Sequence, residues 1–252
     1  MKLCAVALLA CAGSAALAGN ILVVGESTSD TWALAVKGHL NAFGDTATIS
    51  ATVPGSLSGY DQVWDVRWNT AISSSDKSAF GTYLADGGRM FVIGETPALA
   101  TRDNSVLSFL HDTGAGTLTL DSATLVGTQS QTVTTAGQIV NHPNSFTDVY
   151  FSGAGAVTNA GNGFLVTQIA PGKGSIVGWD FGDISGKSQA RMLACFDTQV
   201  LSNLSGWSAT DARNWTRNMR DYLNAPLVPL PTTAGLAAAG LLLIAGARRR
   251  FS

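Results

Sequence analysis

Charge is scarce in this chain of 252 residues. Only 13% of the residues are Asp, Glu, Lys or Arg, whereas an ordinary soluble protein has about a quarter. This composition excludes a charge-rich disordered chain, and 15 basic against 17 acidic residues exclude a basic nucleic-acid binder. Three cysteines are too few for a disulfide-stapled miniprotein. With 46% hydrophobic residues, the chain can build one sizeable core or two small ones.

The amino terminus has the pattern of a secretory signal peptide. Met1-Lys2 supplies one positive charge, residues 3–12 form an apolar run, and Ala16 and Ala18 form an A-x-A site. We predict that signal peptidase cuts after Ala18 and removes residues 1–18. One alternative is a buried N-terminal helix. Another is lipidation at Cys11, but the residues before that cysteine match a lipidation motif poorly.

The carboxyl terminus combines three features. Val228-Pro229-Leu230-Pro231 is a short proline motif, residues 232–247 carry no charge, and Arg248-Arg249-Arg250 follows them. The uncharged run is slightly short of the about 20 residues that span a bilayer, and the residues before it supply the missing length. The arginines would keep this end cytoplasmic and the bulk of the chain outside. A buried C-terminal helix is the alternative, but it does not account for the arginine cluster.

This layout resembles the PEP-CTERM sorting signal in its VPLPA-type variant, with Thr232 where alanine is usual. The resemblance implies a Gram-negative bacterium whose exosortase, a membrane protease-transpeptidase, cuts near the proline motif. An inner-membrane-anchored precursor would then reach the cell surface or extracellular matrix, where such proteins are associated with exopolysaccharide and biofilm. The expected organisation is one domain over 19–224, a linker over 225–231, a transmembrane helix over 232–247 and a cytoplasmic tail over 248–252.

Loss of both ends changes the charge and the cysteine content. Lys2 and the three terminal arginines leave, so 11 basic and 17 acidic residues remain and the formal charge falls from -2 to -6. An acidic domain suits an exported protein and argues against binding to anionic polymers such as nucleic acid. Cys195 is left alone, so no intrachain disulfide can form.

Between the two ends, short apolar runs alternate with helical stretches. Capped amphipathic segments that begin near Asp30 and Ser73 predict helices, and strands are expected at 21–24, 46–53, 62–66 and 90–93. The order strand, helix, strand, strand, helix, strand favours an α/β fold. We expect an open, mostly parallel, doubly wound sheet with helices on both faces.

Residues 60–104, YDQVWDVRWNTAISSSDKSAFGTYLADGGRMFVIGETPALATRDN, resemble the class I glutamine-amidotransferase-like (flavodoxin-like) fold. In that family a Gly-Gly turn, here Gly87-Gly88, precedes the strand that leads to the nucleophile elbow. The elbow falls at Gly94-Glu95-Thr96. An active amidotransferase carries cysteine there, followed later by a histidine and an acid. Because Glu95 takes that place, the resemblance implies the fold without its catalytic cysteine, and we expect no cofactor.

Beyond residue 104 the pattern is less regular. Residues 105–110 predict a helix, and the Thr/Ser/Gly-rich stretch 114–135 predicts short strands or a hairpin insertion. A last amphipathic helix opens at Ala209-Thr210-Asp211. Three further strands are expected, at 149–151, 164–166 and 175–177.

Three carboxylates follow predicted strands. Glu26 and Glu95, the only glutamates, each come after an apolar run and a glycine, and Asp180 follows Gly178-Trp179. Ligands of open α/β sheets bind at the carboxyl ends of strands. If the three side chains converge, they can hold a hard cation such as Ca²⁺ or act as an acid–base pair. We favour the alternative, that each accepts backbone amides of a neighbouring loop or caps a helix, because no known ligand spacing is present.

Arginine, tryptophan and histidine offer weaker signals. Arg67 and Arg102 can face one crevice and bind an anion or a sugar, although an ion pair between Arg102 and Glu95 is the simpler interpretation. The six tryptophans suit glycan stacking or, more commonly, a small core. No metal-ligand spacing relates the three histidines, His39, His111 and His142.

We therefore predict a non-catalytic binding or structural domain on an exported cell-surface or extracellular-matrix protein. The rival hypotheses are a surface hydrolase that uses Glu26, Glu95 or Asp180, and a calcium-dependent binding module. A crevice that holds two carboxyls, one of them with a raised pKa, would favour the hydrolase, whereas a filled strand-end face would argue against it.

Overall fold

The structure is a computed structural model that describes residues 18–122, 125, 127–202 and 206–225. The predicted signal peptide up to residue 17, the proline motif, the apolar helix and the arginine tail lie outside the described residues. Among the described helices, none is long and apolar enough to cross a membrane.

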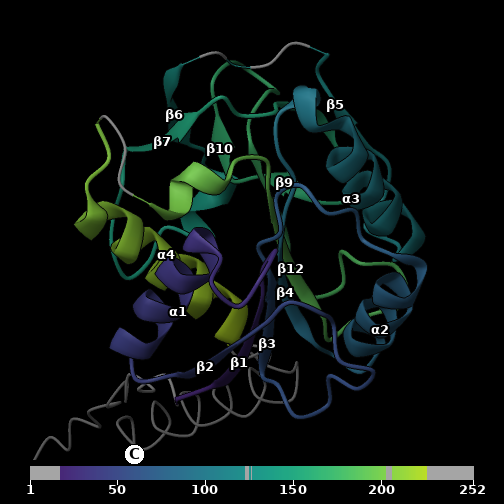
Figure 1. Cartoon of the computed structure of the whole chain (residues 1–252). Coiled ribbons are helices and arrows are strands. Elements are labelled where there is room, and N and C mark those ends of the chain that lie inside the picture. The colour runs from purple at the N-terminus through teal and green to yellow at the C-terminus, as the bar shows by residue number, and fades with distance from the viewer. Residues whose placement is uncertain (1–17, 123–124, 126, 203–205, 226–252) are drawn as a thin grey trace, which may run out of the picture.

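A seven-stranded sheet forms the centre of the domain, in the order β2-β1-β3-β4-β12-β11-β9 (Figure 1). β11 (Ile176–Trp179) runs antiparallel to its two neighbours, β12 and β9 (Phe164–Leu165). The other five strands run parallel to one another: β1 (Asn20–Val24), β2 (Thr46–Ser50), β3 (Gln62–Asp65), β4 (Arg89–Ile93) and β12 (Arg191–Cys195). The predicted α/β fold with a mostly parallel sheet is confirmed.

Helices cover both faces of this sheet. α1 (Thr31–Ala42) and α4 (Ala209–Asn224) pack on one face, and α2 (Ser74–Ala85) and α3 (Ala100–Asp112) pack on the other (Figure 1). Successive side chains of a strand point to opposite faces, so Ile21 and Val23 enter one core and Leu22 and Val24 enter the other. Burial on both faces explains why the strands are continuous apolar runs.

Capping residues set the start of three helices at the carboxyl edge of the parallel strands. Asp30 accepts the backbone N–H of Trp32 and of Ala33 at the start of α1. Ser73 forms a capping box with Asp76 at α2, and Ser208 forms one with Asp211 at α4. The Asp30 and Ser73 caps fix the loops that carry Glu26 and Arg67, whereas α3, which follows the Glu95 loop, begins without a side-chain cap.

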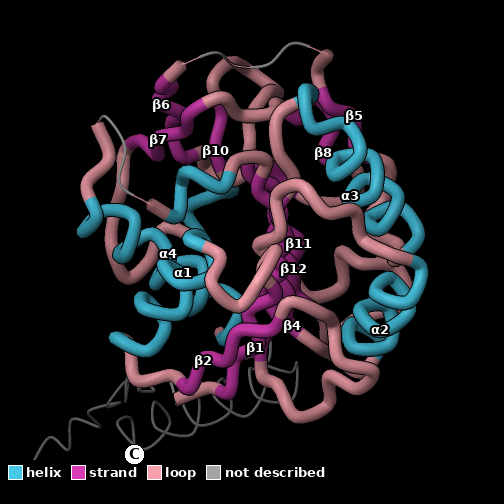
Figure 2. Tube along the Cα trace, viewed as in Figure 1, coloured by secondary structure: helices cyan, strands magenta, loops and turns pink. Residues whose placement is uncertain are grey.

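A smaller layer of short strands lies beyond the carboxyl edge of the parallel strands (Figure 2). β6 (Thr128–Val133), β7 (Asp148–Ser152) and β10 (Thr167–Gln168) form one sheet, and β5 (Leu118–Leu120) pairs with β8 (Val157–Ala160). The predicted insertion of short strands is confirmed, as are the strands that became β7, β9 and β11. The sequence patterns missed β8, β10 and the central strand β12.

Candidate functional site

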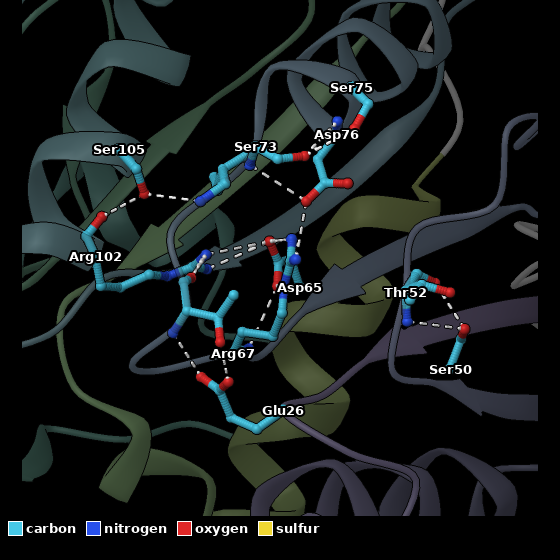
Figure 3. Close-up of polar contacts among 12 residues, drawn as sticks. Glu26, Ser50, Thr52, Asp65, Arg67, Ser73, Ser75, Asp76, Arg102 and Ser105 are labelled. Carbon is cyan, nitrogen blue, oxygen red and sulfur yellow. Dashed lines mark hydrogen bonds and ion pairs between the residues drawn. The ribbon is translucent and has the colours of Figure 1, made fainter.

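Glu26 joins two loops at the carboxyl edge of the sheet. It follows β1, and its Oε1 accepts the backbone N–H of Trp68, Asn69 and Thr70 at 2.9, 2.6 and 2.9 Å. Its Oε2 accepts the Thr70 hydroxyl (Figure 3). Burial opposes ionisation, but these hydrogen bonds outweigh it and lower the pKa of Glu26. Glu26 thus holds the loop after β3, in the backbone-binding role that we favoured.

Glu95 follows β4 at the same edge and is buried beneath the inserted strands. Its Oε1 accepts the backbone N–H and the hydroxyl of Thr198 at 3.0 and 2.6 Å. Gly155 lies directly against it, because a Cβ atom on Gly155 would stand 2.4 Å from the Glu95 carbonyl oxygen. Ala154 and Ala156 on either side are 0% exposed. Residues 154–156 therefore fill the strand-end face above Glu95.

The turn at Glu95 also lacks the backbone of a nucleophile elbow. An elbow holds its nucleophile on a sharp, strained turn between strand and helix, but in the part of the chain that the structure describes only glycines have a positive φ. Cys195 lies beside Ile93 on the neighbouring strand, and its side chain belongs to the core under α1 and α4. Burial raises the pKa of the Cys195 thiol and keeps it protonated.

Asp180 does not join the glutamates, so the convergence that we considered does not occur. Because β11 runs antiparallel to β12, its carboxyl end lies at the amino edge of the parallel strands. There Asp180 accepts a hydrogen bond from Arg191 Nε at 2.6 Å, and the same guanidinium lies over the rings of Phe181 and Tyr222. No group of three His, Cys, Asp or Glu able to hold a metal occurs within the described ranges. The calcium hypothesis built on Glu26, Glu95 and Asp180 is therefore wrong.

Arg67 and Arg102 do lie together, and the group between them is Asp65 (Figure 3). Arg67 binds both carboxylate oxygens of Asp65 through Nε and Nη2, each at 2.8 Å, and Asp76 through Nη1 at 2.9 Å. Arg102 Nη2 lies 3.3 Å from Asp65 Oδ2. Burial opposes the charge on Asp65, but Arg102 and Arg67 outweigh it and lower its pKa. We call these four residues the arginine–aspartate network.

The network occupies the crevice that we considered for an anion or a sugar. The side chains of Asp65 and Arg102 are both 0% exposed. Arg102 also donates its Nε to the Ile93 carbonyl at 2.8 Å, which ties α3 to the end of β4. The predicted ion pair between Arg102 and Glu95 is wrong, because Arg102 pairs with Asp65 while Glu95 binds Thr198.

Two aspartates that the sequence analysis did not single out lie around Glu95. Asp103 Oδ1 accepts the Glu95 backbone N–H at 2.6 Å, and Asp197 accepts the N–H of Ser152 and of Gln199 at 2.5 and 2.7 Å. Burial, reinforced by the charge of Glu95, raises the pKa of Asp103 and that of Asp197 to about 7. Burial also raises the pKa of Glu95. We call Glu95, Asp103 and Asp197 the acidic cluster.

Four of the six tryptophans lie in the core, and two of the three histidines contact a neighbouring side chain. Trp64, Trp179, Trp207 and Trp215 are buried, which agrees with the core interpretation. His39 and His111 lie on different helices: His39 Nδ1 is 3.2 Å from Thr216 Oγ1, and His111 contacts Asp112.

Comparison with known proteins supports the fold. No protein-family model matches the sequence, and no curated protein matches it. The N-terminal domain of mmIFT52 is similar in structure, with a TM-score of 0.62 and 8% identity over 84% of this chain and 100% of that chain. A ThuA-like protein from Parabacteroides merdae ATCC 43184 has a TM-score of 0.51 and 11% identity, over 85% of this chain and 93% of that one.

Part of a larger enzyme has a similar shape. The exo-β-1,4-mannosidase Op5Man5 from Opitutaceae bacterium strain TAV5 matches with a TM-score of 0.51 and 10% identity, over 80% of this chain and 35% of that chain. The chain thus spans about a third of that enzyme. At such low identity these likenesses show the α/β fold and carry no activity with them.

Proposed function

We propose that this chain is an exported cell-surface or extracellular-matrix protein with a non-catalytic, amidotransferase-like binding domain, sorted by an exosortase. The observation that supports a non-catalytic domain is the filled strand-end face. Where an amidotransferase would hold its nucleophile, Glu95 is bound to Thr198 and covered by residues 154–156. A substrate needs a concave, accessible site, and Glu95 is only 7% exposed.

The ends of the described chain fit the proposed sorting signals. Asn20 opens β1 at the amino edge of the sheet. Ala225, which follows α4, lies at the same edge, because its carbonyl accepts Arg191 Nη1 at 3.0 Å from the start of β12. The signal peptide and the sorting helix would therefore both join the domain at one edge. An anchored precursor would present the inserted strands on the side away from the membrane.

Processing of the protein in its native host tests the sorting proposal. We expect mass spectrometry of the isolated protein to show loss of residues 1–18 and of the segment that contains Arg248, Arg249 and Arg250. Changing Pro229 and Pro231 together to alanine should leave the C-terminal segment attached and hold the protein at the inner membrane. Replacing the three arginines with lysine is the matched control, because it keeps the topogenic charge. An intact C-terminus in the wild-type protein would contradict exosortase cleavage and would indicate a single membrane-spanning anchor instead.

The acidic cluster is the observation that favours a second candidate function, hydrolysis. Burial raises the pKa of Glu95 and of the two aspartates beside it. Carboxyl groups with a raised pKa are suited to acid–base chemistry, so a surface hydrolase that uses Glu95 is the rival. We expect purified protein to release no reducing ends from polysaccharides of the host envelope, and Glu95→Gln to behave like wild type. Hydrolysis that is lost in Glu95→Gln but retained in Asp112→Asn, an exposed site elsewhere on α3, would overturn the non-catalytic proposal.

A further inference from the structure

A hollow of about 590 Å³ lies between residues 55–61, α2 and the start of β4. We call it the α2 hollow. Its volume is within the range of about 300–1,000 Å³ that is usual for small-ligand sites. The hollow lies near the amino edge, where β3 and β4 begin, whereas the acidic cluster lies at the carboxyl edge. The segment that fills the face above Glu95 therefore does not obstruct it.

The walls of the α2 hollow are fixed by hydrogen bonds. The Tyr83 hydroxyl, on α2, donates to the Tyr60 carbonyl at 3.2 Å. Asn20 Nδ2 donates to the Gly59 carbonyl at 2.7 Å, and the Asn20 backbone N–H donates to Asp61 Oδ2 at 2.8 Å. Segment 55–61 is thus tied both to α2 and to β1. A site that is held open before a ligand arrives loses less entropy on binding.

Arg89 supplies a hydrogen-bond donor that the protein does not use. Its Nε is buried and has no hydrogen-bond partner among the described residues, although Arg89 lines the hollow. Arg67 and Arg191, by contrast, each hold a carboxylate. A buried N–H without a partner is unfavourable. Nε itself is closed off from the hollow, but a rotation of the half-buried Arg89 side chain would bring its guanidinium to an oxygen atom of a ligand there.

The other polar groups of the lining match a polyhydroxylated ligand. Asp61 and Asp86 supply carboxylates, each of which can accept two adjacent hydroxyls, and the Tyr60 ring can lie against the apolar face of a sugar. One arginine and two aspartates leave the lining negative, which disfavours an anionic ligand. Hydroxyl groups that can donate or accept come from five further residues: Ser56, Ser58, Ser75, Ser78 and Thr82.

We propose that the α2 hollow binds a neutral oligosaccharide segment, with Arg89 and Asp86 as its main polar contacts. This inference rests on the proposed binding function and names its ligand class. Asp86 follows the end of α2 and its side chain is exposed, so it can turn toward a ligand without breaking a contact of the fold. Arg89 lies three residues further on, at the start of β4.

Binding is measured by isothermal titration of the full-length chain in a detergent without a sugar head group. The probes are cellohexaose, maltohexaose, mannohexaose and, as the anionic comparison, hexagalacturonate. We expect at least one neutral probe to bind, and Arg89→Met and Asp86→Asn each to weaken it about tenfold or more, as for a lost hydrogen bond to a charged group. Arg89→Lys should weaken it similarly, because lysine keeps the charge but not the planar Nε–H. Arg213→Met, on the exposed face of α4, is the matched control and should leave the affinity unchanged.

Three results would overturn the sugar site: no binding of any neutral probe, binding that Arg89→Met and Asp86→Asn leave intact, or preference for hexagalacturonate. Unfolding midpoints of the variants separate a lost contact from a lost fold. Failure of this experiment is distinguishable from failure of the proposed function, because C-terminal processing and the test of hydrolysis do not depend on the α2 hollow.

Discussion

Asp65→Asn is expected to lower the free energy of unfolding by about 3–5 kcal/mol, the usual cost of breaking a buried ion pair from one side. Asp65 is fully buried at the end of β3 and is the carboxylate that Arg102 approaches at 3.3 Å. The substitution keeps the shape but removes the negative charge, so Arg102 is left as a buried cation without a carboxylate at ion-pair distance. Arg67 suffers less because it retains Asp76 at 2.9 Å.

Chemical denaturation of the purified protein at pH 7 measures this loss. Asp112→Asn is the matched control, because Asp112 is 55% exposed and faces Lys77 at 3.4 Å, an arrangement worth about 0–1 kcal/mol. The double variant Asp65→Asn with Arg102→Met should recover part of the loss, since it removes both charges together. If Asp65→Asn and Asp112→Asn cost the same, the network does not carry the stability that we assign to it.

The first half of the fold could be predicted because local and long-range signals agree there. Residues 21–24 and 90–93 are apolar in unbroken runs since both faces of β1 and β4 are buried, and each run ends at a glycine. Asp30 and Ser73 mark the helix starts because their side chains cap orphan backbone N–H groups. No long-range information is needed for these assignments.

The residues that meet at the carboxyl edge of the sheet could be predicted only in part, because strand direction and strand pairing depend on tertiary structure. Burial periodicity is the same whether β11 runs parallel or antiparallel, so the sequence alone does not tell at which edge of the sheet Asp180 lies. β12 was missed, and with it Asp197, which comes two residues after Cys195. The apolar run 192–196 that ends beside Asp197 is a signal that could have found both. Nothing in the sequence around Asp65 distinguishes it from an ordinary strand residue, although it is the centre of the arginine–aspartate network.

The free energy of unfolding should be greatest in mildly acidic solution. We expect the acidic cluster to lower it as the pH rises further. An aspartate in the unfolded chain has a pKa of about 3.9, whereas burial raises that of Asp103 and that of Asp197 to about 7. The folded state therefore binds protons more tightly than the unfolded state. This contribution to stability is complete below about pH 4 and is lost as the pH rises toward 7. For one such carboxyl the loss is on the order of 2–4 kcal/mol.

Unfolding by urea at pH 4.5, 5.5, 6.5 and 7.5 tests this dependence. Asp103 Oδ1 accepts the Glu95 N–H while Oδ2 has no partner within the described residues, so Oδ2 is the atom free to carry the proton. Asp103→Asn mimics the protonated form and should flatten the decline, making the variant less sensitive to pH than wild type. Asp197→Asn should act in the same direction, whereas Asp86→Asn, at an exposed site, should follow wild type.

Asp65 and Glu26 have a lowered pKa and therefore act in the opposite direction. They destabilise the fold only at lower pH, as they become protonated. Stability that rises from pH 5 to 7 in both wild type and Asp103→Asn would show that these buried acids are already ionised in the folded protein.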